Sequence, residues 1–185
     1  MPMDKPRQSA LPLGTMPFVP ILRIAPFAIC LITALASLIA YADTPLAPSS
    51  NYDVRSPSGK FFARVDPKFG VSVYSTGSTN GIWRLSKWFR QAFLADDGDH
   101  FISVHDNLIP KNFKNNLPLI TFWNRDKKIR DVTVGELFPD TSALKSTVSH
   151  YNWGEVTGLT NMSLIVTRCD GKIARFNIAT GEMLK

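Results

Sequence analysis

Acidic and histidine side chains gather in one short stretch and are the first residues whose types could bind a metal ion. They are Asp96, Asp97, Asp99, His100, His105 and Asp106. Their spacing is not that of a calcium-binding EF-hand loop, in which oxygen ligands alternate along the loop and a glutamate closes it. His100 and His105 are an odd number of residues apart, so a regular strand would point them to opposite faces. We therefore expect a solvated turn here and no metal site.

A second group combines a histidine with aromatic side chains, in the stretch Ser149-His150-Tyr151-Asn152-Trp153-Gly154. His150 can donate or accept a proton near neutral pH, and Tyr151 and Trp153 each join a large apolar body to a polar tip. These three residues could form a polar-aromatic binding corner. The alternative is a loop that packs over the core with a hydrogen-bonded histidine. The sequence leaves both interpretations open.

A third group is basic and aromatic: Arg84, Lys87, Trp88 and Arg90. Cations beside a large aromatic ring suit an anionic surface such as a membrane or a polyanion. Lys111 and Lys114 could extend such a surface. Binding to an anionic surface through this segment is therefore one of the functions that we consider. No specific nucleic acid is expected as a partner, because the charge of the chain is not extreme.

Nucleophilic and redox chemistry has no recognisable pattern in the sequence. Cys169 lies beside an expected hairpin turn without an identifiable base, which indicates an ordinary thiol at a strand end. The sequence contains no Gly-x-Ser-x-Gly, His-Glu-x-x-His, Walker, Cys-x-x-Cys or dinucleotide-binding glycine pattern. We therefore expect no cofactor and favour a binding role over an enzyme. A small envelope hydrolase, with His150 and an aspartate converging in a deep pocket, is the alternative.

The first part of the chain indicates export. Basic residues precede an uncharged run from Ile24 to Ala42, and this run ends in Ala40-Tyr41-Ala42, with small residues where a signal peptidase requires them. We expect residues 1–42 to be a signal peptide, whose start is either Met1 or Met16. An N-terminal membrane anchor is the alternative, because the 19 uncharged residues would span about 28 Å as a helix.

Removal of residues 1–42 would leave 143 residues with a net charge of +4, whereas the whole chain carries +6. Cys169 would then be the one cysteine left, so no internal disulfide could form and stability would come from packing. An exported domain without disulfides suits the periplasm or the cell surface of a bacterium. If the apolar run is not cleaved, the domain is tethered to the inner membrane.

Turn residues and short alternating runs predict the organisation of the remaining chain. A proline- and serine-rich stretch predicts a linker over 43–51, followed by a single β-rich domain over 52–185. We count about ten strands by alternation and by the turn residues between them. They include the runs Lys60–Val65, Val71–Tyr74, Phe101–Val104, Leu119–Trp123, Ile129–Val132, Met162–Thr167 and Lys172–Ile178, the last two joined by a tight turn at Asp170-Gly171.

Two segments leave room for helix. From Ile82 to Phe93 the apolar residues recur at helical spacing, which would give a basic amphipathic helix. The Asp-Asp-Gly turn that follows Leu94, and the strand-like run after it, favour a strand in a hairpin arm instead. A short helix is expected near 134–149, on either side of Pro139.

Three turns resemble those of β-propeller repeats. Ser56-Pro57-Ser58-Gly59-Lys60-Phe61 and the stretch from Ala95 to Phe101 are similar to the Ser-Pro-Asp-Gly-Lys turn of WD40-like blades, and Cys169-Asp170-Gly171-Lys172-Ile173 follows the same grammar. The turn glycines lie 39 and 73 residues apart, about one blade period and then two. The stretch from Phe176 to Leu184 resembles the end of quinoprotein-type repeats, with Asn177 in place of the aspartate of that family and Lys185 in place of its tryptophan. No quinone-binding residue is carried over.

The chain also resembles, more loosely, exported bacterial domains of unknown function that contain Trp-Phe-Arg, Asp-Asp-Gly and Ser-His-Tyr-x-Trp-Gly stretches. Together the resemblances imply an all-β fold with two to three propeller-like blade sheets, or an open meander or sandwich. About ten antiparallel strands cannot close a ring of at least four four-stranded blades. An open stack exposes edge strands, which pair readily with another chain. We therefore expect an exported cell-envelope binding or scaffolding domain, with a protein partner or self-association through sheet edges.

Overall fold

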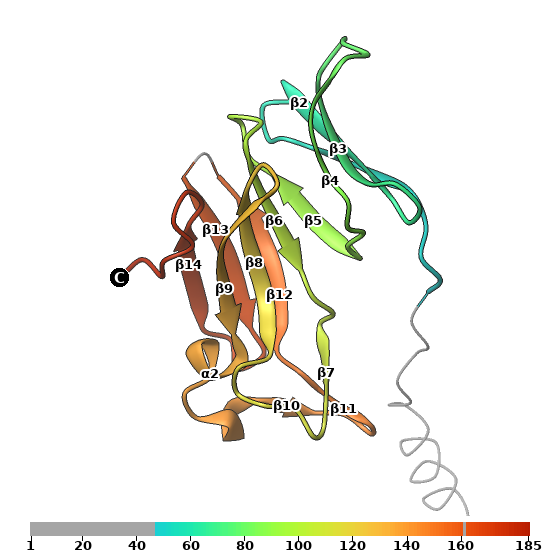
Figure 1. Cartoon of the computed structure of the whole chain (residues 1–185). Coiled ribbons are helices and arrows are strands. Elements are labelled where there is room, and N and C mark those ends of the chain that lie inside the picture. Colours follow the sequence, from blue (N-terminus) through green and yellow to red (C-terminus); the bar gives the residue numbers. More distant parts are fainter. Residues whose placement is uncertain (1–46, 161) are drawn as a thin grey trace, which may run out of the picture. The chain divides into compact units, whose positions relative to one another are not determined.

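A computed structural model describes residues 47–160 and 162–185 of the chain (Figure 1). The expected signal peptide or anchor over 1–42, and the first half of the expected linker, lie outside the described residues. Within the described part, no helix has the length and apolar character needed to cross a membrane.

The described residues form fourteen strands in four antiparallel sheets, which confirms the prediction of a mainly β fold. The count exceeds the predicted ten because five strands have four residues or fewer and are too short for a clear alternation. The first sheet contains β1 (Tyr52–Arg55), β2 (Phe61–Asp66), β3 (Gly70–Ser75) and β4 (Gly81–Leu85), in that order.

The second sheet contains, in spatial order, β5 (Gln91–Leu94), β6 (His100–Val104), β8 (Pro118–Asn124) and β9 (Lys127–Thr133). The third sheet contains β12 (Gly154–Leu159), β13 (Ser163–Arg168) and β14 (Ile173–Asn177). A small sheet contains β10 (Lys145–Ser146), β11 (His150–Asn152) and β7 (Leu108–Pro110), in that order. In the sequence, β7 lies between β6 and β8, which both belong to the second sheet. The expected Asp170-Gly171 turn joins β13 to β14.

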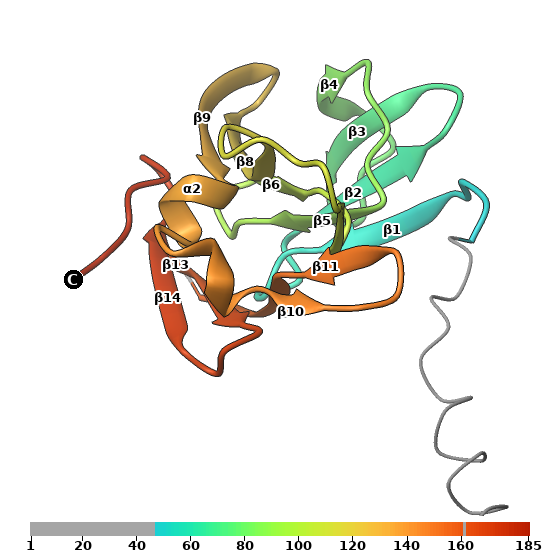
Figure 2. The ribbon, with the colours of Figure 1, turned by 90° about the horizontal axis from the view of Figure 1, so that it is seen from below.

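The second sheet is buried on both faces because it lies between the first and the third (Figure 2). Successive side chains of a strand point to opposite faces. Phe101 of β6 accordingly packs into a core with Val65 and Val73 of the first sheet, whereas Ile102 packs into a second core with Val166 of the third sheet. The outer faces of the first and third sheets are the ends of this stack.

The segment from Ile82 to Phe93 is not a helix but two strands joined by a loop, in line with the hairpin that the turn after it indicated. It contains most of β4 and the start of β5, joined by the loop Ser86–Arg90, and β5 forms a hairpin with β6. Trp83 of β4 and Ala92 of β5 are both buried in the core between the first and second sheets. Two strands can therefore bury these side chains on one side while the basic residues between them stay exposed.

The expected helix near 134–149 is a single turn, α2 (Val134–Leu137). The Thr133 hydroxyl accepts a hydrogen bond from the backbone N–H of Glu136 and so caps its first turn. Phe138 has left the helical region because the residue before a proline avoids it, and Pro139 follows. A single 3-10 turn, Thr141–Ala143, leads into β10.

The glycines of the first two repeat-like turns occupy equivalent places in the fold. Gly59 lies between the first and second strands of the first sheet, and Gly98 lies between the first and second strands of the second sheet. Both have a positive φ, +71° and +72°, which favours glycine. Gly171 also has a positive φ, but it lies between the second and third strands of its sheet. Gly59 and Gly98, 39 residues apart, therefore lie in equivalent turns, whereas Gly171, 73 residues after Gly98, does not.

Candidate functional site

The acidic and histidine residues between Asp96 and Asp106 are used in turns and pairs. Asp97 accepts hydrogen bonds from the backbone N–H groups of Asp99 and His100, and its other oxygen lies 2.6 Å from Nδ1 of His100. Burial alone would raise the pKa of Asp97, but these hydrogen bonds outweigh it and lower the pKa. Asp99 pairs with Arg125 at 3.0 Å. In residues 47–160 and 162–185, no group of three histidine, cysteine, aspartate or glutamate side chains is arranged to hold a metal ion.

The four predicted basic-aromatic residues do not form one surface. Arg84 lies on the outer face of the first sheet, where its Nε donates a 3.1 Å hydrogen bond to the hydroxyl of Ser72. Lys87, Trp88 and Arg90 lie instead in the loop between β4 and β5. The reason is the alternation of β4, which points Trp83 into the core and Arg84 away from it.

Trp88 and Arg90 hold the start of the described chain. The indole N–H of Trp88 donates to the carbonyl oxygen of Ser50 at 3.1 Å, and the guanidinium of Arg90 donates to the carbonyl oxygen of Ala47 at 2.7 Å. The guanidinium also lies 5.5 Å from the centre of the Trp88 ring. Both side chains therefore have a structural use that their sequence spacing did not indicate.

Three cavities follow one another along the segment His105–Leu108. The first, of about 190 Å³, lies between Lys87–Arg90 and this segment. The second, of about 330 Å³, lies between Arg90, Gln91 and the same segment. The third, of about 300 Å³, begins at Asn107 and reaches β12. The first and second cavities share Arg90, His105 and Asp106, and the second and third share Asn107. We call the three cavities together the inter-sheet groove.

Three edge strands begin at the inter-sheet groove. Gln91 is the first residue of β5, Leu108 the first of β7 and Gly154 the first of β12, and all three residues line the groove. Each strand is at the edge of its own sheet, the second, the small and the third respectively. An edge strand has one row of backbone N–H and C=O groups without a partner in its sheet. The first residue of an edge strand from each of three different sheets thus lines the groove.

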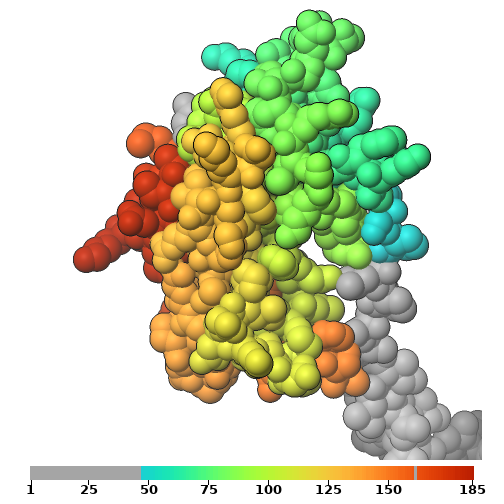
Figure 3. Space-filling view, viewed as in Figure 1, coloured from blue at the N-terminus to red at the C-terminus, as the bar shows by residue number. Residues whose placement is uncertain are grey.

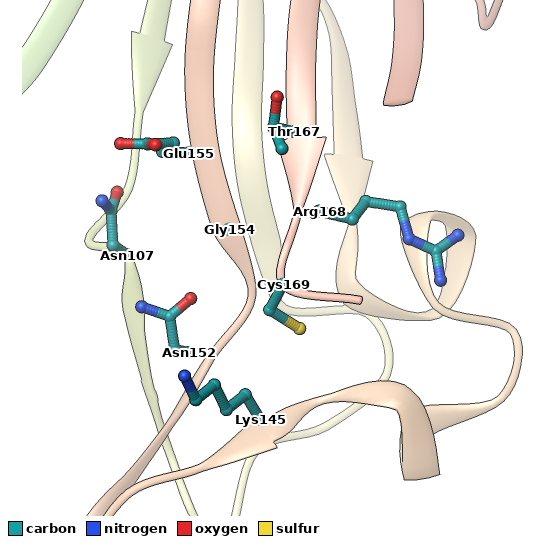
Figure 4. A pocket seen from close by; sticks show the side chains of 8 residues that line it. All are labelled: Asn107, Lys145, Asn152, Gly154, Glu155, Thr167, Arg168 and Cys169. Atoms are coloured by element: carbon teal, nitrogen blue, oxygen red, sulfur yellow. The ribbon is translucent and has the colours of Figure 1, made fainter. Parts of the chain in front are cut away.

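The third cavity is lined by polar side chains from four separate parts of the chain. Lys145 comes from β10, Asn152 from β11, Glu155 from β12 and Asn107 from the loop before β7 (Figure 4). Lys145 and Glu155 form no ion pair with any described residue. The amides between them can both donate and accept hydrogen bonds. This part of the groove therefore offers both signs of charge and neutral polar groups.

Two further residues line the third cavity but have structural partners elsewhere. The guanidinium of Arg168 lies 4.3 Å from the centre of the Phe138 ring and 2.8 Å from the carboxylate of Asp170. The thiol of Cys169 donates to the carbonyl oxygen of Ala143 at 3.3 Å. Cys169 lies just after β13, at the strand end where the sequence predicted it.

His105 lies between the first two cavities, with Lys87 on one side. Desolvation of the ring lowers the pKa of His105, and the ammonium of Lys87 lowers it further, while the carboxylate of Asp131 acts in the opposite direction. The neighbouring Asp106 lies 3.7 Å from Nε of Arg90, and its carbonyl oxygen accepts the indole N–H of Trp153 at 2.7 Å. Asp106 is therefore held by Arg90 through its side chain and by Trp153 through its backbone.

His150, Tyr151 and Trp153 do not converge into a binding corner. Trp153 has no exposed surface and belongs to the core between the second and third sheets. Tyr151 packs against Phe113, and the ammonium of Lys111 lies 4.1 Å from the centre of its ring. Nδ1 of His150 lies 2.8 Å from the hydroxyl of Ser149. His150–Asn152 is strand β11 and not a loop, but His150 has a hydrogen-bond partner and Trp153 packs into the core, as in the alternative that we considered. His150 lines none of the three groove cavities.

Sequence reasoning missed several residues that line the groove, among them Gln91, Asn107 and Lys145. They belong to no motif and are far apart in the chain. The turn and loop residues between predicted strands indicated where strands end. They did not indicate which strand ends lie next to each other in the fold. A comparison of the chain with protein-family models and with curated proteins found no match.

Proposed function

We propose that the chain is an exported binding domain of the cell envelope that holds an extended segment of a protein partner in the inter-sheet groove. The observation that carries this proposal is that three edge strands, β5, β7 and β12, each contribute their first residue to the lining of the groove cavities. A peptide in extended conformation can add to an open strand edge through backbone hydrogen bonds. Export itself rests on the sequence of residues 1–42.

The side chains around the groove support a polar partner segment. Gln91, Asn107 and Asn152 offer amide groups that can pair with a peptide backbone or with polar side chains. Lys145 and Glu155 offer opposite charges that no described residue neutralises. The lining of the third cavity is almost entirely polar, so this part of the groove favours an extended chain that carries charged residues. Trp88, Phe89 and Val104 give the first cavity an apolar lining.

We propose further that the first, second and third sheets are blade-like repeats. Each is an antiparallel meander that follows chain order and begins with an edge strand, β1, β5 or β12. The carboxylate of Asp96 in the second sheet's turn accepts the backbone N–H of Ser58 in the equivalent turn of the first sheet, at 2.7 Å. An open stack of such repeats leaves its strand edges available to a partner.

Photo-cross-linking in living cells tests the binding role. The full chain is produced with benzoylphenylalanine at Gln91, in the groove, or at Ile173, which is exposed on β14 and outside the groove cavities. We expect a discrete adduct of one mass from Gln91 and none of that mass from Ile173. Equal adducts from both positions would contradict the proposal.

A blocking variant makes the experiment specific. Asn107→Trp places a large ring between the second and third cavities, because Asn107 lines both. The Gln91 adduct should decrease at least tenfold in this variant. Asn80→Trp, in the exposed connection between β3 and β4, is the matched control and should leave the adduct unchanged. An adduct that survives Asn107→Trp would place the partner outside the groove.

A further inference from the structure

A second surface lies at one end of the first sheet and is built from cations and aromatic rings. Lys68 and Phe69 belong to the turn between β2 and β3, and Lys87 and Trp88 belong to the loop between β4 and β5. Phe69 is 60% exposed, which makes it the most exposed aromatic side chain among the large apolar residues of the described chain. We call this set the Lys68–Phe69 surface.

The turn and the loop are in direct backbone contact. A Cβ atom added at Gly70 would lie 2.2 Å from the carbonyl oxygen of Leu85 and 2.6 Å from the backbone nitrogen of Lys87. Glycine is therefore required for this close approach. The contact places Phe69 and Lys87 at the same end of the sheet, although 18 positions separate them in the sequence.

The two lysines of the surface carry uncompensated charge. The ammonium of Lys68 lies 5.2 Å from the centre of the Phe69 ring, and that of Lys87 lies 5.5 Å from the centre of the Phe89 ring. Neither forms an ion pair with a residue that the structure describes. Of the nearby carboxylates, Asp66 accepts the backbone N–H groups of Lys68 and Phe69, and Asp106 lies 3.7 Å from Nε of Arg90.

The described part of the chain begins beside the β4–β5 loop of this surface. Trp88 and Arg90 bind the carbonyl oxygens of Ser50 and Ala47, so the start of the described chain is fixed beside the β4–β5 loop (Figure 3). Only residues 43–46 separate Ala47 from Ala42, the last residue of the uncharged run. A fully extended chain of this length reaches at most about 17 Å. The described chain therefore begins beside Trp88 of this surface, a few residues after the end of the uncharged run.

We propose that the Lys68–Phe69 surface docks on the face of an anionic phospholipid bilayer. The ammonium groups of Lys68 and Lys87 would lie at the lipid phosphates, and the ring of Phe69 would enter the interfacial layer, where aromatic side chains are favoured. This surface shares Lys87 and Trp88 with the first cavity of the groove, whereas Lys68 and Phe69 line none of the three cavities.

The expected affinity of the surface for a bilayer is low unless the domain is also attached to the membrane. One lysine near an anionic membrane changes the binding constant about fivefold, so two lysines and one phenylalanine bind weakly alone. A chain that is still joined to residues 24–42 has a high effective concentration at the bilayer, which converts a weak contact into a populated one. Docking is therefore expected in the full chain before or without cleavage.

The test is amine footprinting of the full chain in vesicles. The chain is inserted into vesicles of phosphatidylcholine, or of phosphatidylcholine with one quarter phosphatidylglycerol, and lysine acetylation by a soluble reagent is measured by mass spectrometry. We expect acetylation of Lys68 and Lys87 to fall at least threefold in the anionic vesicles. Lys172, in the β13–β14 turn, should not change. At about 1 M salt the Debye length is near 3 Å, and the protection should disappear.

Two variants test whether the protection depends on Phe69 or on the loss of any exposed apolar side chain. Phe69→Ser should remove at least half of the protection at Lys68. Ile173→Ser is the matched control, because Ile173 is 63% exposed and follows Lys172 directly. Equal labelling in both vesicle types, or equal protection of Lys172, would overturn the proposal. Protection of Lys68 and Lys87 by single-stranded DNA to the same extent would assign the surface to a soluble polyanion and also overturn it.

Discussion

The backbone N–H of Ser58 donates a 2.7 Å hydrogen bond to the carboxylate of Asp96 and so joins the first turn of one sheet to the first turn of the next. The turn glycine of the second sheet also lies against the first, since a Cβ atom at Gly98 would be 2.7 Å from the ring of Phe61. Two stretches of similar sequence are therefore neighbours in space. This contact fixes how the first and second sheets meet.

Asp96→Asn should weaken the junction between these two sheets. The hydrogen bonds from Ser58 lower the pKa of Asp96 below its ordinary 3.8, so the folded state binds this proton less tightly than the unfolded state. The stabilisation by the charged carboxylate is therefore complete above pH 3.8 and is lost as the pH falls through the lower pKa of the folded state. We expect wild type to exceed Asp96→Asn in unfolding free energy near neutral pH and to converge with it in strong acid. Urea unfolding at several pH values measures this, and a constant difference would contradict it.

Gly70→Ala should be much more destabilising than Gly77→Ala. Both glycines have a positive φ, +79° and +84°, so both variants carry backbone strain. Gly70 alone lies against the backbone of Leu85, whereas Gly77 has nothing within 4 Å of its added Cβ. We expect a cost of about 3 kcal/mol or more for Gly70→Ala and about 1 kcal/mol for Gly77→Ala. Equal costs in chemical denaturation would show that the turn does not pack against the β4–β5 loop.

Trp153→Phe should expose the structural role of a residue that the sequence nominated for binding. The variant removes the indole N–H that the carbonyl oxygen of Asp106 accepts, and it leaves space in a fully buried site. We expect a loss of about 2–4 kcal/mol in unfolding free energy. Trp88→Phe also removes an indole hydrogen bond, but this bond is exposed to solvent and the side chain is only partly buried, so the variant should cost less than about 1 kcal/mol. A reversed order would contradict this assignment.

His105 should titrate below its ordinary pKa of 6.5, and its neighbours should move that value in opposite directions. Lys87→Met should raise the pKa of His105, and Asp131→Asn should lower it further. Because the folded state releases this proton more readily than the unfolded state, stability rises with pH across the interval between the two pKa values. Proton NMR of the histidine rings measures the titration. An unchanged pKa of His105 in Lys87→Met would contradict an electrostatic interaction between Lys87 and His105.

The fold class could be predicted from the sequence because local patterns determine it. Val71–Tyr74 alternates and lies in β3, and Asp170-Gly171 turns between β13 and β14. The short helix expected near 134–149 is α2, which ends after one turn, before Pro139. The shortest strands, such as β10 and β7, could not be predicted, since they exist only because partners from distant segments pair with them.

The candidate site could be predicted only in part, for the same physical reason. Lys87, Trp88 and Arg90 were identified from their types, and they border the inter-sheet groove. Their hydrogen bonds to Ala47 and Ser50, however, depend on where the first strand begins. Asn107 and Lys145 meet across the groove through sheet stacking, which no spacing in the sequence encodes.

The central claim is that open strand edges at the inter-sheet groove receive an extended segment of a partner. The most direct measurement is amide hydrogen exchange of the full chain, alone and in the complex captured at Gln91. We predict slower exchange in Gln91–Leu94, Leu108–Pro110 and Gly154–Leu159, with β14 unchanged. Unchanged exchange in these three segments, or protection confined to the outer face of the first sheet, would contradict the claim.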